Sequence, residues 1–243
     1  IRAQLRLWVH LLDHYLSDGG SYLQEGRGED RKFYFQLSAQ GSAGHRGLTQ
    51  VNDGELLWIL EENADARQLQ RVDLQQLRES GVLDENEISM PGLDEIGMGG
   101  LAGMMRSIQK SFRFDQAVQI ESGAGRRVWA MRGPWRQEQL AKLVATGKKS
   151  PSKMAKLVSR LPEWAPTDIG ILLDVDTLFP YKIEFLRASQ AEDSGKPVFT
   201  LIATLEFFEV QFNVDIPRNS FNKPSSIDWV DVTKKMLRRT AAE

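Results

Sequence analysis

The sequence predicts an α+β protein built on a large antiparallel β-sheet. Runs in which apolar and polar residues alternate fill the first third of the chain and return in the last third, as in strands with one buried face. Helix-like apolar periods are concentrated in the middle third. The connections between the first six strand candidates are short, which is typical of an antiparallel meander and not of βαβ units.

The first strands are expected at residues 5–11, 22–24 and 33–37. The alternation over 5–11 indicates a strand, although a helical pattern that runs on to Leu16 competes with it. The Asp-Gly-Gly sequence at 18–20 tolerates positive φ, so a turn is expected there. Aromatic residues dominate 33–37, as strands favour.

The strongest local signal is a β-hairpin centred on Asp53 and Gly54. Strand-like residues 48–51 precede this pair and residues 56–60 follow it. An Asp-Gly pair favours the type I′ turn, which needs two residues at positive φ and has a twist that matches the strands. A further strand is expected at 68–72.

The middle of the chain is predicted to be helical. Asp73 is placed to cap a helix over 74–80, and Pro134 and Pro151 each suit the first turn of another helix. A Gly-rich hinge is expected to lead into a helix over 101–112. The remaining strands are expected at 116–120, 127–131, 169–173, 181–186 and 198–216, with a final helix at 228–239.

Composition excludes several classes of protein. The longest apolar runs fall far short of the ~20 residues that a membrane-spanning helix needs. The chain has no Cys, which excludes disulfides, thiolate metal sites and cysteine nucleophiles. Because the first residue is Ile1 and not Met, the start is interpreted as either a processing boundary or an artificial one, and a signal peptide or lipid anchor before it stays open. The absence of Cys fits an exported protein, which is the expectation here.

Charge is spread unevenly along the chain. Between two acidic segments, residues 106–160 contain 13 Lys and Arg against 3 Asp and Glu. This basic segment is interpreted either as solvated helix faces or as a surface for an anionic membrane or an acidic protein partner. Four arginines of this basic segment lie in or near the strand candidate at 127–131, namely Arg126, Arg127, Arg132 and Arg136. Nucleic acid is not expected, because the pI is ≈ 6.0 and the flanking segments are acidic.

Three short motifs imitate functional sites. His10 and His14 could chelate zinc on a helix, but on one strand they would lie ~13 Å apart. Residues 97–102 match Gly-x-Gly-x-x-Ala, but no strand precedes them to build a dinucleotide site. Asp174 and Asp176 lack the further ligands of a calcium loop. We therefore expect no metal, no cofactor and no catalysis, although an enzyme built from dispersed residues stays open.

Motifs along nearly the whole chain occur in the order of a known family. In the first half they lie at 22–24, 33–37, 51–59 and 70–74, where Asn52-Asp53-Gly54 leads to Leu57-Trp58. In the second half they lie at 178–184, 208–214 and 215–217, followed by Phe221. Together these segments resemble the LolA/LolB-like lipoprotein-carrier superfamily.

The resemblance implies a half-barrel, which is a strongly curved antiparallel sheet with helices covering its concave face around an apolar cavity. It implies a single domain over 1–243, with an acidic, Gly-rich helical insertion at about 74–115. Residues 97–105 are expected to form a mobile flap over the cavity mouth, because methionine adapts to irregular apolar surfaces. The ligand-binding candidates are Tyr22, Phe33, Phe35, Leu56, Trp58, Leu60, Met98, Leu101, Met104 and Met105.

The function implied by the resemblance is non-enzymatic binding or carriage of a lipid or lipidated protein in the periplasm or cell envelope. The partners would be lipid or lipoprotein acyl chains. The alternative is an envelope sensor or scaffold module that binds another protein through the same sheet.

Overall fold

The computed structural model describes residues 1–11, 14–41, 44–80, 93–123, 125–144, 154–190 and 197–241. Its strands are β1 (Arg2–Leu11), β2 (His14–Glu25), β3 (Lys32–Gly41), β4 (Gly44–Asn52), β5 (Leu56–Glu62), β6 (Arg67–Asp73), β7 (Ala117–Glu121), β8 (Arg127–Pro134), β9 (Asp168–Asp174), β10 (Pro180–Gln190), β11 (Pro197–Gln211) and β12 (Trp229–Asp231). Its helices are α1 (Leu74–Glu79), α2 (Leu93–Ser111), α3 (Gln137–Leu143), α4 (Met154–Val158) and α5 (Thr233–Ala241), with short 3₁₀ helices η1 (Gly28–Asp30) and η2 (Arg218–Phe221).

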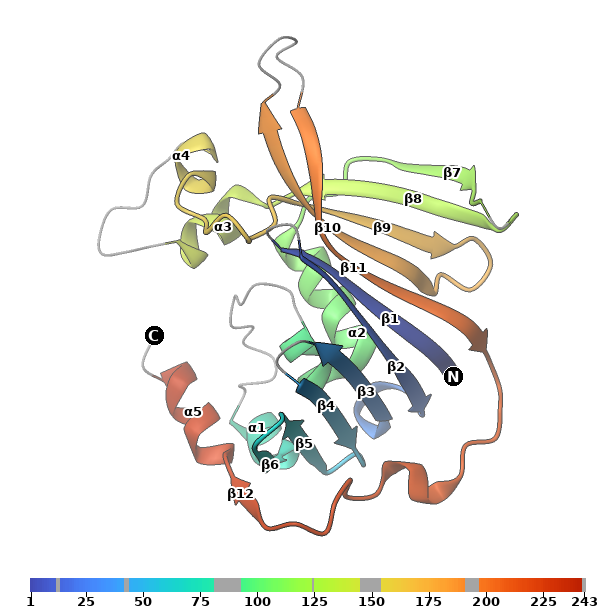
Figure 1. Ribbon diagram of the computed structural model, residues 1–243, viewed down its shortest axis with the longest axis vertical. Helices are drawn as coiled ribbons and strands as arrows, with labels where there is room; N and C mark the ends of the chain where they lie inside the picture. The colour runs from blue at the N-terminus through green and yellow to red at the C-terminus, as the bar shows by residue number, and fades with distance from the viewer. Residues whose placement is uncertain are drawn as a thin grey trace.

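All the described strands belong to one twelve-stranded sheet (Figure 1). The order is β12-β6-β5-β4-β3-β2-β1-β11-β10-β9-β8-β7, so β12 and β7 are its two ends and the sheet is not closed. Two antiparallel meanders, β1 to β6 and β7 to β11, join where β1 pairs with β11. Among the described strands, only β12 pairs in parallel, with β6. The predicted α+β class with a large antiparallel sheet is confirmed.

The two faces of the sheet have different roles. Side chains alternate between the faces along each strand, and the register aligns Tyr22 of β2 with Ala3 of β1 and Phe35 of β3. The same face continues from Leu5 of β1 to Phe207 of β11. We call the face that carries these five residues face A and the opposite face B.

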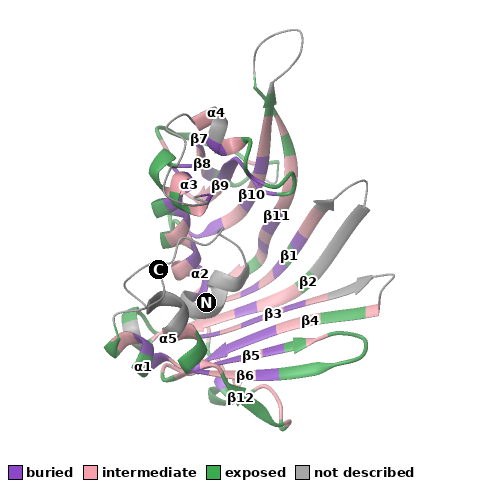
Figure 2. Cartoon of the chain, turned by 90° about the vertical axis from the view of Figure 1, so that its left-hand side faces the viewer, coloured by how far each residue is buried: buried purple, intermediate pink, exposed green. Residues whose placement is uncertain are grey.

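The helices pack on face A. Buried side chains from α1, α2, α3 and α4, including Leu77, Met104, Leu140 and Leu157, join those of face A in one core cluster. Burying each such side chain stabilises the fold by about 1.5–3 kcal/mol. Figure 2 shows buried segments across the middle of the sheet and exposed segments at the tips of β4, β5 and β6.

Face B is covered at one end by the C-terminal part of the chain. Val51, Trp58 and Leu60 of this face form a second buried cluster with Phe221 of η2. The Trp229 ring of β12 meets the Trp58 ring edge-on, with the centroids 5.9 Å apart. The segment after β11 therefore returns along the sheet to place β12 beside β6 (Figure 1).

Two local predictions are confirmed in position. The Asp73 carboxylate caps α1 by accepting a hydrogen bond from the Gln76 amide at 2.9 Å. The hairpin at Asp53 and Gly54 joins β4 to β5, but it is not the predicted type I′ turn, since only Gly54 of this pair has positive φ. Asp53 Oδ1 instead accepts from the Leu56 amide at 2.7 Å, and an Asp-centred turn of this kind needs no positive φ at Asp53.

The first hairpin differs from the prediction. Residues 18–20, predicted as a turn, lie inside β2, and the hairpin falls between His10 of β1 and His14 of β2. The ~13 Å separation expected for these histidines on one strand is therefore wrong, and their side chains lie outside the described residues. Gly20 has another role, because a Cβ there would lie 1.9 Å from the Gln36 carbonyl oxygen of β3.

The predicted helix starts are also corrected. Pro134 is the last residue of β8, and α3 begins only at Gln137. The final helix begins at Thr233, and the preceding residues 229–231 form β12. A three-residue strand is too short to show the alternation that reveals a longer one. Pro151 lies outside the described residues.

We predict that Gly20→Ala destabilises the protein while Gly19→Ala does not. The added methyl group at Gly20 must displace the β3 backbone, which costs on the order of 1–3 kcal/mol of unfolding free energy. A methyl group at Gly19 meets nothing within 4 Å, and a change within about 0.5 kcal/mol is expected there. Urea unfolding of both variants measures the difference. Equal stability of the two would contradict the assigned β2–β3 register.

Candidate ligand-binding site

The structure divides the predicted ligand-binding residues between the two faces. Tyr22, Phe33, Phe35, Leu101 and Met104 are buried in the face A core, and Met105 is half-buried against it. Leu56, Trp58 and Leu60 belong to the face B cluster. Met98 lies in α2, with its side chain outside the described residues. The structure thus brings six of the candidates together on face A.

The period of the strand explains the placement of Trp58. Leu56, Trp58 and Leu60 alternate, so they share one face, but alternation alone does not say which face the helices will cover. The register pairs Trp58 with Val51 on face B, whereas the neighbouring Leu57 is fully buried in the face A core. Leu57 is a face A residue that was not among the predicted ligand-binding residues.

Helix α2 meets face A at a kink. Gly100 has φ 61° and ψ −163°, a conformation that only glycine adopts readily. A Cβ at Gly100 would lie 3.0 Å from Phe33 Cδ1 and 3.2 Å from Tyr22 Oη. The next amide, that of Leu101, donates a hydrogen bond to Tyr22 Oη at 3.2 Å, and Tyr22 Oη donates to Gln24 Oε1 at 2.7 Å. The helix backbone is thereby fixed to β2.

Burial keeps the Tyr22 hydroxyl protonated. The side chain is fully buried, and desolvation raises the pKa of Tyr22 far above its usual value. The hydroxyl therefore stays a donor to Gln24 at any physiological pH. The predicted flap over 97–105 is corrected in part, because Leu101 and Met104 lie in the core and so the residues after Gly100 are packed on the sheet.

An aromatic path crosses face A from Tyr22 towards the sheet margin. The Tyr22 ring packs edge-on against Phe207 of β11, with centroids 6.1 Å apart. Phe207 in turn packs against Phe179, at 5.5 Å, and Phe179 against both Tyr181 and Phe212. Edge-on pairs of this kind are worth about 0.5–1.5 kcal/mol beyond their buried area. The path joins strands of both meanders.

Apolar side chains continue face A beyond its buried centre. Val9, Leu48, Ile59, Met131, Leu173 and Phe185 are half-buried against the core. They come from β1, β4, β5, β8, β9 and β10, so strands of both meanders contribute to this apolar margin. An apolar ligand on face A would contact these side chains without entering the packed core.

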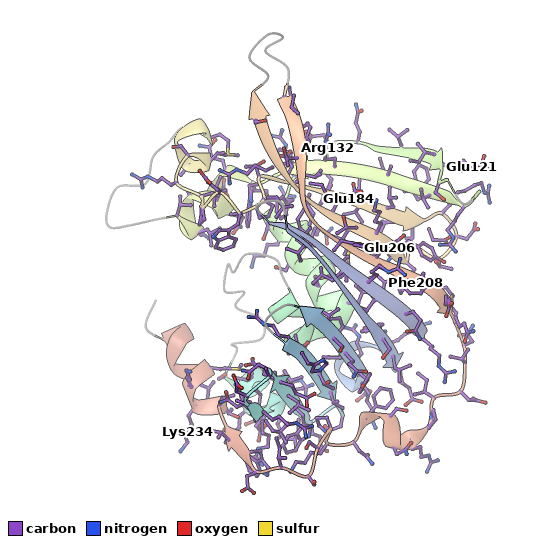
Figure 3. The ribbon with its side chains drawn as sticks, viewed as in Figure 1. Glu121, Arg132, Glu184, Glu206, Phe208 and Lys234 are labelled. Carbon is purple, nitrogen blue, oxygen red and sulfur yellow. The ribbon has the colours of Figure 1, made fainter. Side chains whose placement is uncertain are left out.

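Face B is polar between β1 and β10. Cross-strand pairing aligns Arg6 with Glu206 and Glu206 with Lys182. Lys182 also forms an ion pair with Glu184 at 2.6 Å, and the Arg6 guanidinium lies 5.2 Å from the Phe208 ring centroid. Figure 3 shows Glu184, Glu206 and Phe208 on β10 and β11. Apolar contact is therefore the chemistry of face A and not of this part of face B.

The four arginines singled out in the basic segment contact the protein itself. Arg126 stacks over Tyr181 at 3.7 Å from the ring centroid, and Arg132 stacks over the Phe199 ring at 3.9 Å. Arg127 lies 3.8 Å from an Asp176 carboxylate oxygen, and Arg136 donates to a backbone carbonyl. Arg127 and Arg132 are five positions apart on β8, so they lie on opposite faces.

The two other motifs that resemble functional sites, at residues 97–102 and at Asp174, form part of a helix and a turn. Residues 97–102 lie within α2, so they do not connect a strand to a helix. Asp174 Oδ1 accepts from the Thr177 amide and hydroxyl, both at 2.8 Å, in the β9–β10 turn. Among the described residues, no group of three or more His, Asp or Glu is arranged to hold a metal. No helix within the described part of the chain is long and apolar enough to span a membrane.

Comparison with known proteins gave matches only among solved structures, since no protein-family model and no curated protein matches the chain. One is a DUF1329 family protein from Desulfovibrio piger, with TM-score 0.37 and 7% identity, covering 91% of this chain and 88% of that one. Another is described as an outer membrane lipoprotein-sorting protein domain from Vibrio parahaemolyticus, with TM-score 0.24 and 14% identity over the same shares.

We predict that Tyr22→Phe destabilises the protein more than Tyr34→Phe. Both hydroxyls donate to a Gln two residues ahead, but only Tyr22 Oη also accepts from a buried amide, that of Leu101. Leaving that amide without a partner costs about 1–3 kcal/mol, whereas the half-buried Tyr34 bond is worth about 1 kcal/mol or less.

Urea unfolding gives the loss of stability, and hydrogen exchange at the Leu101 amide reports the local contact. Faster Leu101 exchange is expected only in Tyr22→Phe. The assigned contact is refuted if both variants lose the same stability and keep wild-type exchange at Leu101.

Proposed function

We propose that this protein binds a lipid, or the acyl chains of a lipidated protein, on face A, and that it acts as a carrier in the cell envelope and not as an enzyme. The observation that carries the proposal is the apolar margin of face A. Half-buried apolar side chains from six strands border the core on the side where the helices pack. Face A would be the concave face of the curved sheet, with the helices over it.

The chemistry of face A suits an alkyl chain. The buried hydroxyl of Tyr22 already forms hydrogen bonds with Leu101 and Gln24, so it stabilises the fold and is not open to a ligand. The half-buried side chains of the apolar margin supply contacts without charge. Each methylene moved from water to such surroundings contributes about 0.8 kcal/mol, so on the order of ten methylenes give ~8 kcal/mol before entropic costs.

An acyl-chain displacement experiment tests this proposal. The protein is expected to bind a fluorescent fatty acid, and Ile59→Gln and Leu48→Gln, at the margin of face A, should each weaken binding about tenfold, since ~1.4 kcal/mol of apolar contact is lost. Ile120→Gln, at an exposed position on face B of β7, is the matched control and should bind as the wild type does.

Thermal unfolding of the three variants separates weaker binding from loss of fold. Native mass spectrometry of the protein isolated from an envelope should also show added acyl-chain mass. Binding that is equal in all variants, or absent from the wild type, would refute a lipid site on face A and favour the alternative of a protein-binding module.

The basic segment supports a second part of the proposal, contact with an anionic membrane. Each Lys or Arg near an anionic surface is worth up to about 1 kcal/mol, so the 13 cations of residues 106–160 suffice for adsorption if only a few face the bilayer. We expect the protein to sediment with anionic vesicles at low salt and not with zwitterionic ones, and to be released as salt shortens the Debye length. Equal binding to both kinds of vesicle, or to neither, would contradict membrane contact. The basic segment would then be interpreted as solvated helix faces.

A further inference from the structure

Strand β7 ends the sheet, and no element within the described residues covers it. All five of its residues are exposed, and β8 is its only neighbour in the sheet (Figure 1). Val118 and Ile120 are 55% and 42% exposed, and their two-residue spacing puts them on the same face of the strand. Unpaired edges invite pairing with another strand, and proteins usually block them with Pro, Lys or a bulge. Strand β7 has none of these.

The opposite end of the sheet shows what a protected edge looks like. There β12 is only three residues long, its Asp231 forms an ion pair with Arg71, and α5 follows almost at once. Such a short, charged edge offers little to a further strand. The two ends of the sheet thus differ, and β7 is the end that is open to pairing.

The hydrogen-bonding groups of β7 divide into an inner and an outer set. The Ser122 amide donates to the Arg126 carbonyl oxygen at 2.8 Å, which makes this a hydrogen-bonded pair of the β7–β8 ladder. Such pairs recur at every second residue, so the backbone groups of Val118 and Ile120 point towards β8. The N–H and C=O groups of Ala117, Gln119 and Glu121 therefore point outward.

We propose that two copies of this chain pair through β7, antiparallel and about a two-fold axis at Gln119. In this register Gln119 faces Gln119 of the second copy, and Ala117 faces Glu121 in both directions. Each of these three pairs can exchange two backbone hydrogen bonds, so every outward group of the strand is satisfied. The two sheets would become one continuous sheet.

The side chains are compatible with the same register. Val118 comes opposite Ile120 of the second copy, and the β8 neighbours of these residues, Ala130 and Val128, extend the row on each side. The only charged residue of β7, Glu121, lies beside Arg127 of its own chain and opposite an alanine, so no like charges face each other. The space around Gly123, which would face residue 115 of the second copy, is open.

The affinity is expected to be modest. Five residues from each copy bury far less than the ~800 Å² per partner of a standard interface. Sedimentation velocity from micromolar to millimolar protein should therefore show a shift from one chain towards two. Gln119→Pro removes an outward donor but no bond to β8, and should stay monomeric. Gln119→Ala keeps the backbone donor and is the matched control, with dimerisation like the wild type.

Cross-linking tests the register itself, because the natural chain has no Cys. Facing residues in a hydrogen-bonded antiparallel pair have Cα atoms about 5.5 Å apart, which suits a disulfide. Gln119→Cys should thus form covalent dimers on mild oxidation, whereas Ala117→Cys should not, because its two copies are about 13 Å apart along the strands. A wild type that stays monomeric at all concentrations, a dimeric Gln119→Pro or equal cross-linking of both Cys variants would overturn the proposal.

Discussion

The pairing of β1 with β11 holds the two halves of the protein in one sheet. It joins residues as far apart in sequence as Arg6 and Glu206, and so closes most of the chain into a loop. The entropic cost of that closure rises only slowly with loop length. It is offset by the burial of Leu5 and Phe207, which face each other on face A. Without this seam the aromatic path from Tyr22 would end at β2, and neither meander alone would present a broad apolar face.

Because side chains alternate between the two sides of a strand, the two faces of the sheet differ in surface chemistry. On face A this alternation lines up apolar side chains on which the helices pack, and the close approach of α2 depends on Gly100. On face B the same alternation lines up Arg6, Glu206 and Lys182 in a row that water can reach. An apolar face and a solvated polar surface thus lie back to back, one strand thickness apart.

The sequence predicted the individual strands and helices better than it predicted how they are arranged. Long alternating strands and the Asp73 cap depend on local rules, so they were predictable. Strand β12 was missed, because its three residues are held by Trp58 and Arg71 from distant strands. Trp58 itself belongs to face B, and only the packing of the C-terminal segment decides that. Gly20 was read as a turn residue, although it serves a close approach between strands that no local pattern reveals.

The long-range seam also has a consequence for biosynthesis. During synthesis on the ribosome, the edge of β1 that pairs with β11 stays unpaired until β11 is complete at Gln211. At about 5–20 residues per second, that interval lasts on the order of 10–40 seconds. During that time the nascent N-terminal meander exposes the apolar surface of Tyr22 and Phe35, which the finished protein covers. Chaperones that bind extended apolar segments would have their longest opportunity on this half of the chain, and the finished sheet would form only after synthesis is nearly complete.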